Sequence, residues 1–411
     1  MGAKRGTARV AGGGVRARAA IALVPFVVAG LVAGCDDGKI VVGPPVDAWE
    51  WTALGGPDAP TPALVGNHET LVVVGGDLLL GTADGVWRRP LAGSAQWARA
   101  GLGGFSVHAL AVTADGGRII AAGTDPEDDA APTVWYSTSG GTDWVPAAVW
   151  PRGAPGGPEA GLSFPFYTLE PDPADENVVY GGLDADSIAV TVDGGATWVL
   201  ANGAESPNFG DPCVPHRPKG ANVLLQGCEL PLDTAWLGAL DVNEQDRFAL
   251  TGFRFVFGYP NLVELGNRRI NSIVAPPARA NRILVGVEGG LVELTSKSGS
   301  WSSAADVDAR WIYRSESDTR HRPYAYIRAI APLGDSGRPV LFGGTVNGEN
   351  EVLSLFEENG GIVRRIDAPF ALEDPRVEQA VRLDADDVLI VISDVTPGGR
   401  RTSKVYRLRR D

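Results

Sequence analysis

Paired carboxylates are the side chains in this sequence whose spacing could do chemistry. Acidic residues cluster in three turn-like segments, which hold Asp125, Glu127, Asp128 and Asp129, then Asp184 and Asp186, and then Glu244 and Asp246. Two carboxyl groups about 5–10 Å apart across one pocket can act as the acid and base, or the acid and nucleophile, of glycoside hydrolysis. Because the chain has 50 acidic residues against 36 basic ones, solvated loops are the ordinary interpretation of these clusters.

Other chemical motifs give weaker signals. The segment from Asp125 to Asp129 offers hard oxygen ligands for Ca²⁺, but its spacing matches no calcium loop. Cys213-Val-Pro-His216 resembles half of a metal site, yet His68, His108 and His321 lie far away in sequence and supply no second half. The sequence has no Gly-x-Ser-x-Gly, P-loop or His-Glu-x-x-His motif. We therefore expect no metal or cofactor, and a protein that is not an enzyme.

The first 34 residues predict a signal peptide. Five basic residues (Lys4, Arg5, Arg9, Arg16 and Arg18) precede an apolar run from Ala19 to Leu31, which is too short to indicate a membrane span. The run ends in Leu31-Val-Ala-Gly-Cys35. This ending resembles the bacterial lipobox, and the resemblance implies cleavage before Cys35 and acylation of its thiol and amine, typically including a palmitate. Several acyl chains give stable membrane anchoring.

The alternative is an ordinary secretory signal that happens to contain a cysteine. With the lipobox, we expect a lipid-anchored, extracytoplasmic protein on a bacterial cell membrane, with residues 35–45 as its tether. Asp36 resembles an inner-membrane retention signal, and the choice between inner and outer membrane stays open. Removing the leader leaves 31 basic and 50 acidic residues, a net charge of −19. This charge argues against nucleic acid and anionic lipid headgroups as partners.

Export also bears on the two remaining cysteines. Cys213 and Cys228 are predicted to form a disulfide, because paired cysteines in exported chains are usually oxidised. A loop of that length would constrain the unfolded chain by about 3 kcal/mol in the chain-entropy model.

Tryptophans mark a repeat along the chain. Trp51, Trp97, Trp144, Trp198 and Trp301 are separated by 46, 47, 54 and 103 residues, and the last gap is close to two units. Short apolar runs that end in glycine recur between them, at 78–81, 119–123, 178–181, 283–286 and 340–343. A repeat of this length is typical of β-propellers, and the apolar runs predict inner strands buried between neighbouring blades.

One turn sequence identifies the repeat. Thr191-Val-Asp-Gly-Gly-Ala-Thr-Trp198 is predicted to be a turn in which Asp193 bonds backbone, Gly195 accepts φ > 0, and Trp198 is buried. A degraded copy is Ser137-Thr-Ser-Gly-Gly-Thr-Asp-Trp144. The pattern resembles the Asp-box, or BNR repeat, of β-propellers, and the repeat is similar to WD40 and YVTN repeats. The resemblance gives Thr191, Asp193, Gly195, Thr197 and Trp198 a structural role.

Sortilin-type, photosystem-assembly-factor-type and BNR-repeat propellers are the families that the chain resembles. They imply a rigid disc whose loops bind a protein, peptide or glycan. Sialidases share the box, but their catalytic pattern has no match here: the nearest segment, Arg268-Arg-Ile-Asn271, lacks the expected proline.

We therefore predict an all-β, seven-bladed propeller of four-stranded blades over residues 46–411, with six or eight blades as alternatives. The last blade lacks a strand, which Ala48-Trp-Glu-Trp-Thr-Ala53 would supply, so that the N-terminal strand closes the ring. The fourth blade, about 203–265, is irregular and pinned by the disulfide. Its alternating aromatic run, Phe253 to Tyr259, predicts either a strand packed on blade five or an aromatic platform for a sugar or peptide.

The function expected from these features is a lipid-anchored, monomeric cell-envelope propeller that acts as a non-enzymatic binding or assembly scaffold for a protein, peptide or glycan. The alternative is an envelope glycoside hydrolase that uses loop carboxylates. A purely structural lipoprotein is a third possibility.

Overall fold

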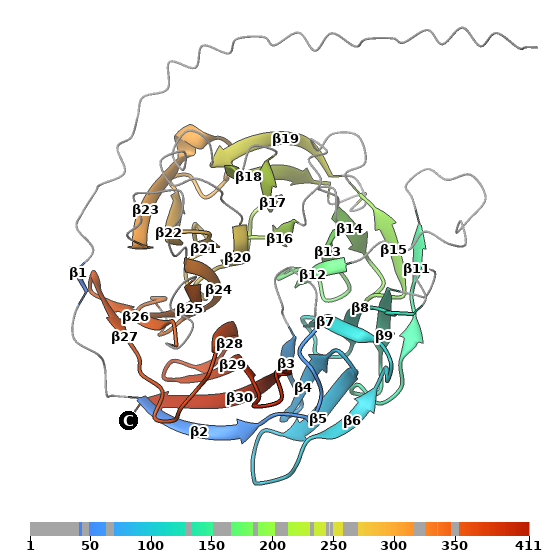
Figure 1. The fold of residues 1–411 in the computed structure, drawn as a ribbon. Coiled ribbons are helices and arrows are strands. Elements are labelled where there is room, and N and C mark those ends of the chain that lie inside the picture. The colour runs from blue at the N-terminus through green and yellow to red at the C-terminus, as the bar shows by residue number, and fades with distance from the viewer. Residues whose placement is uncertain are drawn as a thin grey trace, which may run out of the picture. The chain divides into compact units, whose positions relative to one another are not determined.

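The described strands form a seven-bladed β-propeller (Figure 1). The computed structural model describes residues 41–42, 49–62, 70–127, 133–150, 166–183, 188–201, 213–230, 234–243, 246, 250–257, 270–315, 325–334, 336–346 and 353–410. All of them belong to one compact unit, 34–411. The blade number and the all-β class agree with the sequence-based prediction.

Blades one to four follow one another along the chain, each as an antiparallel sheet. Blade one contains β3 (Leu71–Val74), β4 (Asp77–Thr82), β5 (Gly85–Pro90) and β6 (Ala98–Gly101). Blade two contains β7 (Ser106–Val112), β8 (Ile119–Thr124), β9 (Val134–Ser137) and β10 (Val145–Pro146). Blade three contains β12 (Phe166–Pro171), β13 (Val179–Leu183), β14 (Ile188–Thr191) and β15 (Thr197–Leu200). Blade four contains β16 (Val214–His216), β17 (Val223–Leu230), β18 (Thr234–Val242) and β19 (Leu250–Phe257).

The remaining blades complete the ring. Blade five contains β20 (Ile270–Val274), β21 (Arg282–Val287), β22 (Gly290–Ser296) and β23 (Val307–Arg314), with the 3-10 turn η2 (Ala304–Asp306) before its last strand. Blade six contains β24 (Ala325–Pro332), β25 (Val340–Val346), β26 (Leu355–Asn359) and β27 (Ile362–Arg365). Blade seven contains β28 (Arg376–Asp384), β29 (Asp387–Val395) and β30 (Arg401–Arg410).

The fourth strand of blade seven comes from the other end of the propeller. β2 (Trp49–Gly55) pairs antiparallel with β30, with Trp49 opposite Arg410 and Trp51 opposite Leu408. This confirms the prediction that the N-terminal strand closes the ring. Closure places strands that are about 350 residues apart in sequence into one sheet.

Two blades gain a fifth strand that the sequence analysis did not predict. β11 (Ala148–Trp150) pairs in parallel with β15 of blade three, and β1 (Val41–Val42) pairs in parallel with β27 of blade six. Both added strands lie at the outer edge of their sheets (Figure 1). The outer edges of these blades therefore accept extended segments of the chain itself.

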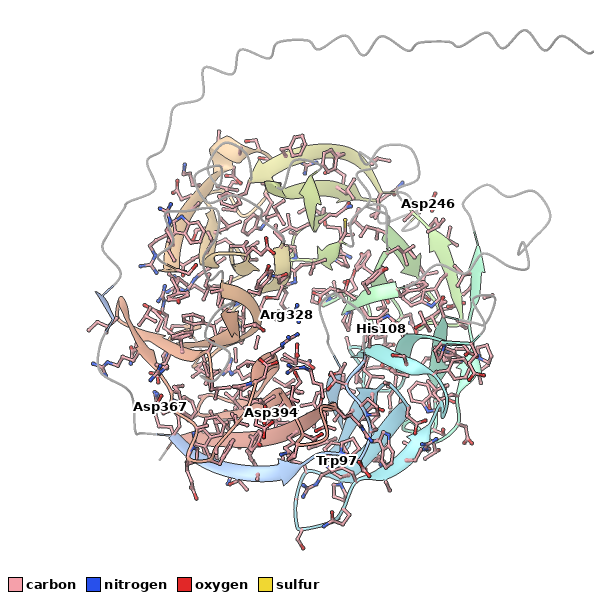
Figure 2. All side chains as sticks on the ribbon, in the orientation of Figure 1. Trp97, His108, Asp246, Arg328, Asp367 and Asp394 are labelled. Carbon is pink, nitrogen blue, oxygen red and sulfur yellow. The ribbon has the colours of Figure 1, made fainter. Side chains whose placement is uncertain are left out.

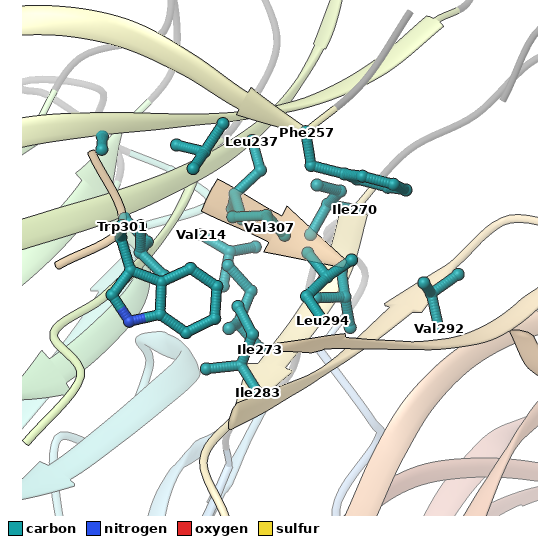
Figure 3. Packing of buried hydrophobic residues seen from close by; sticks show 14 of the residues in the cluster. Val214, Leu237, Phe257, Ile270, Ile273, Ile283, Val292, Leu294, Trp301 and Val307 are labelled. Atoms are coloured by element: carbon teal, nitrogen blue, oxygen red, sulfur yellow. The ribbon is translucent and has the colours of Figure 1, made fainter. Parts of the chain in front are cut away.

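The apolar runs that end in glycine form β4, β8, β13, β21 and β25. They are the second strands of their blades, which confirms their prediction as inner strands buried between neighbouring blades. A second strand has sheet neighbours on both sides and adjacent blades on both faces, which explains the continuous apolar run. In β21 every residue from Arg282 to Val287 is buried. Ile283, Val285 and Val287 pack with residues of β18 and with Trp301 in the cluster between blades four and five (Figure 3).

Glycine at the end of the second strand allows the next blade to approach. Gly81 lies in β4, and a Cβ built on it would lie 2.7 Å from the carbonyl oxygen of Val107 in β7. The oxygen belongs to a backbone inside another sheet, so it cannot move away cheaply. At this contact, the two blades can approach because residue 81 has no side chain.

Gly81→Ala should therefore destabilise the propeller by about 1–3 kcal/mol through overpacking. Gly398→Ala is the matched control, because the nearest atom to a Cβ there is the Thr396 hydroxyl at 3.8 Å. Thermal or urea unfolding of both variants measures the difference. Equal stability of the two would contradict the proposed role of close backbone approach.

Candidate functional site

The Asp-box residues make the turn that the sequence predicts. The Thr191 hydroxyl donates to Asp193 Oδ1 at 2.8 Å and accepts a hydrogen bond from the Gly195 amide at 2.9 Å. Asp193 Oδ1 accepts from the Thr197 amide at 2.8 Å, and the Trp198 indole donates to the Gly195 carbonyl at 3.1 Å. Trp198 is fully buried. The polar groups of the box are therefore used within the turn itself.

The box also contacts the preceding blade. Arg118, which directly precedes β8, donates to the carbonyls of Asp193 and, at 3.4 Å, of Gly194. Gly195 has φ = +96°, and a Cβ on it would lie 2.8 Å from Ile120 Cγ1. The turn of blade three thus packs directly on blade two, which makes the box a contact between blades.

The degraded copy keeps the same geometry with a hydroxyl in place of the carboxylate. Ser139 Oγ accepts from the Asp143 amide at 2.8 Å, which is the bond that Asp193 makes to Thr197. Ser137 Oγ accepts from the Gly141 amide at 3.0 Å, and the Trp144 indole donates to the Gly141 carbonyl at 3.1 Å. A serine therefore suffices for the turn.

Blade five has a third version that the sequence analysis missed. The Ser296 hydroxyl accepts from the Gly299 amide at 2.9 Å, and the carboxylate comes from Asp306, downstream of the turn. Asp306 accepts from the Ser296 hydroxyl at 2.5 Å and from the Ser298 amide at 2.9 Å. Partial burial raises the pKa of Asp306, but these hydrogen bonds outweigh it and lower the pKa below its usual value.

Asp193→Ala should lower the stability of the protein by about 1–3 kcal/mol, because two hydrogen-bonding groups of the turn lose their partner. Asp143→Ala is the control, since the Asp143 side chain is exposed and does not hold its turn. Ligand binding should be largely unchanged in both variants. An Asp193→Ala protein with native melting temperature and lost binding would contradict the structural role.

Of the carboxylates singled out in the sequence, those in the described residues belong to loops of two different blades. Asp125 and Glu127 lie in one exposed turn after β8, where Asp125 accepts a hydrogen bond from the Glu127 amide at 2.8 Å. Asp246 lies across the ring from Asp367 (Figure 2). Asp128, Asp129, Asp184, Asp186 and Glu244 lie outside the described residues. Within the described part of the chain, no three metal-binding side chains gather, and no helix is long and apolar enough to span a bilayer.

The cysteine pair lies at the start of blade four. Val214 of β16 is opposite Gly227 of β17, so the antiparallel register places residue 213 opposite residue 228. Opposed positions of this kind suit a disulfide. The Cys228 side chain lies outside the described residues, and the disulfide stays a prediction. The Nδ1 atom of His216 is 2.8 Å from Glu170 of blade three.

The polar residues of the innermost strands join neighbouring blades. Arg328 of β24 projects towards the axis (Figure 2) and is 3.0 Å from Glu378 of β28. Glu378 also accepts from the Ser393 hydroxyl at 2.5 Å. The Gln379 side chain accepts from the Leu71 amide at 2.7 Å and donates to its carbonyl at 3.0 Å, which links blade seven to blade one. These groups are engaged in holding the ring together.

A buried polar cluster joins blades three and four. Arg217 is paired with Asp172, and Asp172 accepts from the Tyr180 hydroxyl at 2.8 Å. All three side chains are at most 4% exposed. Burial, and next the Asp172 carboxylate, raise the pKa of the Tyr180 hydroxyl well above its usual value. A perturbed pKa can mark an active site, but this cluster has no access to solvent and is structural.

This shift predicts a loss of stability in alkali. The folded state favours neutral Tyr180, so its contribution is complete below about pH 10, the pKa of an unfolded tyrosine, and falls as the pH rises further. Tyr180→Phe should be less stable at pH 7 by about 1 kcal/mol for the lost hydrogen bond, and should lose stability less steeply above pH 10. Urea unfolding across this range measures it. Tyr136→Phe is the control. If Tyr180→Phe lost stability above pH 10 as steeply as wild type does, the prediction would be contradicted.

The aromatic strand of blade four packs on two neighbouring blades and not on one. Phe257 packs with Ile270 of blade five, but Phe253 packs on the cluster between blades three and four. A register shift between Leu237 and Gly238 opposite the strand interrupts the period of two, and Phe255 is 51% exposed. The expectation that the whole aromatic face packs on blade five was therefore wrong. Tyr259 lies outside the described residues.

An open cleft of about 780 Å³ lies between β27 and β28. Its lining is Leu353, Arg365, Asp367, Ala368, Phe370, Ala371, Leu372 and Glu373. At the exposed side of the cleft, Arg365 Nε donates to Asp367 Oδ1 at 2.9 Å. Asp367 lies at the rim of the ring (Figure 2). The cleft thus combines an apolar floor with charges of both signs, which is the usual composition of a binding site.

Aromatic rings from the ring closure support the floor. Phe370 stacks on Tyr406 of β30, with ring centroids 4.6 Å apart, and meets Trp51 of β2 edge to face at 5.5 Å. Asp394 accepts from the amides of Glu373 and Asp374 at 3.1 and 2.9 Å and so fixes the end of the loop. Burial and the nearby Asp394 carboxylate raise the pKa of Tyr406. The cleft is therefore preformed by strands from both ends of the propeller.

Comparison with known proteins shows the fold. No protein-family model matches the chain, and no curated protein matches it in sequence. The WD40 β-propeller domain of Doa1 is similar at a TM-score of 0.52 with 10% identity, over 88% of this chain and 98% of that chain. YCF48 bound to a D1 peptide is similar at 0.51 with 13% identity, over 90% and 98%. YCF48 from Cyanidioschyzon merolae is similar at 0.50 with 15% identity, over 88% and 98%.

At these identities the likeness establishes a β-propeller and nothing finer. The box residues were found from sequence because the turn is local. The cleft was missed, because its floor joins the loop after β27 to Trp51 and Tyr406, which are far away in sequence. The signal in the sequence was the apolar run Ala368-Pro-Phe-Ala-Leu372 in the connection between two strands.

Proposed function

We propose that this protein is a lipid-anchored propeller of the bacterial cell envelope that acts as a non-enzymatic binding or assembly scaffold. Its ligand is a protein segment or peptide bound in the cleft between blades six and seven. The cleft is the observation that carries the proposal: it is preformed, and its lining is not used by the repeat turns.

The chemistry of the cleft suits a peptide chain. Phe370, Leu353 and Leu372 offer apolar surface to a side chain, and the stacked rings beneath Phe370 hold it in place. The hydrogen-bonded pair of Arg365 and Asp367, together with Glu373, can interact with groups of either charge. An extended chain presents such alternating groups, and the similar propeller YCF48 is bound to a peptide in its solved structure.

Localisation follows from the leader. Cys35 and the small residues before it support acylation, which would hold the propeller at the membrane surface. A scaffold that is fixed there could present the cleft to the exported segments of envelope proteins.

The test starts with native envelope membranes and the full acylated protein. Capture followed by mass spectrometry identifies bound proteins, and overlapping peptides of each one are then measured by titration. The double variant Arg365→Ala/Asp367→Ala should weaken peptide binding about 5–50-fold, the usual range for a lost charge pair in a partly desolvated site. Both residues are exposed enough that folding should be retained.

The matched control is Arg99→Ala/Asp84→Ala, an exposed ion pair of similar accessibility on blade one. Its affinity should equal that of wild type. Equal loss in both double variants would place binding elsewhere, and no partner with the acylated protein would overturn the scaffold.

The glycoside hydrolase is the second candidate, since Asp367 and Glu373 are two carboxylates in one cleft. It predicts that wild type releases sugar from an envelope glycan, and that Asp367→Asn and Glu373→Gln each abolish release. A captured peptide with no sugar release would favour the scaffold.

A further inference from the structure

The acylation site and the outer edge of blade six are close together along the chain. Five residues lie between Cys35 and Val41, so the chain makes six residue steps from one to the other. β1 is paired with β27 through Val41 opposite Ile362 and Val42 opposite Val363. Six extended residues reach at most about 20 Å. If the acyl chains at Cys35 lie in a bilayer, the edge strand of blade six must lie within that distance of its surface.

The strands at this edge have an unusual charge. β1, β2, β27 and β30 contain one acidic residue, Glu50, against seven basic ones: Arg364, Arg365, Arg401, Lys404, Arg407, Arg409 and Arg410. The whole chain has the opposite balance, with 50 acidic and 36 basic residues. We call the outer parts of these four strands the basic rim.

Ion pairs neutralise part of the basic rim. Asp387 accepts from Arg407 at 2.8 Å and from Arg409 at 3.1 Å, so two guanidinium charges face one carboxylate. Arg410 is paired with Glu357 of β26, which shows that the end of β30 lies beside blade six. Arg364 is exposed, and the Arg409 side chain is 52% exposed. Arg365 and Arg401 are also paired, with Asp367 and Asp374. The positive charge that remains accessible in the basic rim therefore comes mainly from Arg364, Lys404 and Arg409.

We propose that the basic rim is the surface with which the propeller faces its membrane, in contact with anionic phospholipid headgroups. This rests on the lipid anchor of the proposed function and adds an orientation to it. The acyl chains supply attachment, and the arginines supply a local attraction that holds blades six and seven towards the bilayer. The net negative charge of the chain, which argues against anionic lipid as a partner of the surface as a whole, repels the rest of the surface from an anionic bilayer, so that only the basic rim is expected to contact it.

The orientation has a consequence for binding. With an edge of the ring against the membrane, the disc stands upright and neither of its faces is covered by lipid. The cleft between blades six and seven then lies close to the bilayer, where the exported part of a membrane protein first emerges. The short tether and the position of the cleft thus serve the same purpose.

The experiment uses the full acylated protein in phosphatidylcholine vesicles that contain phosphatidylglycerol and a quencher attached to lipid headgroups. A fluorophore is placed at Asn359→Cys, at the exposed end of β26, or at Val145→Cys, on the 45% exposed edge residue of blade two. Blade two lies three blades away around the ring. An unsubstituted sample corrects for labelling of the native cysteines.

Quenching should be several-fold stronger at position 359 than at position 145. Arg364→Glu/Arg409→Glu should reduce this asymmetry, whereas Arg99→Glu, a rim arginine of similar exposure on blade one, should leave it unchanged. With vesicles that lack phosphatidylglycerol, the labelled wild-type sequence should show the same reduced asymmetry as the double variant. Salt at 1 M should do the same, because it shortens the Debye length to about 3 Å.

Two failures are distinguishable. Mass spectrometry of the membrane-bound protein shows whether Cys35 is acylated, and a chain without acyl groups would overturn the anchor and the orientation together. Acylated protein in which both labels are quenched equally, or position 145 more strongly, would overturn the basic rim alone and leave the anchored scaffold in place.

Discussion

The pairing of β2 with β30 is the interaction on which the rest of the structure depends. It joins the first and last strands of the propeller in one sheet and leaves blade seven without a missing strand. The same pairing brings Trp51 and Tyr406 under Phe370, so the floor of the cleft exists only in the closed ring. It also places β1, and with it the predicted tether, at the edge of blade six.

Closure works because the blades fit one another at short range. Gly81 lets the first strand of blade two approach the second strand of blade one, and Arg118 joins the Asp-box of blade three to blade two. Near the axis, Gln379 binds the backbone of Leu71 across the closing joint. Each contact is small, and each depends on the two blades already being held side by side. We therefore expect the ring to unfold cooperatively.

The sequence predicted what is set locally or by counting. The box residues Thr191 to Trp198 bond to one another within a few positions, and the unfilled place in blade seven identified residues 48–53 as the closing strand. It did not predict contacts between distant segments. Asp306 replaces a box carboxylate from outside the turn, and Phe370 meets partners from both ends of the propeller. A shifted register in blade four likewise removed the periodicity on which the aromatic strand was predicted.

Hydrogen–deuterium exchange of the acylated protein tests the central claim most directly. If β2 closes the ring, the amides of Trp49 to Gly55 that pair with β30 should be as strongly protected as those of β29, because both exchange only when the propeller opens. Exchange of the β2 amides in seconds, with β29 and β30 still protected, would show that the ring closes without its N-terminal strand. The cleft would then lose the contacts that form its floor, and the proposed orientation would lose the placement of β1 at the edge of blade six.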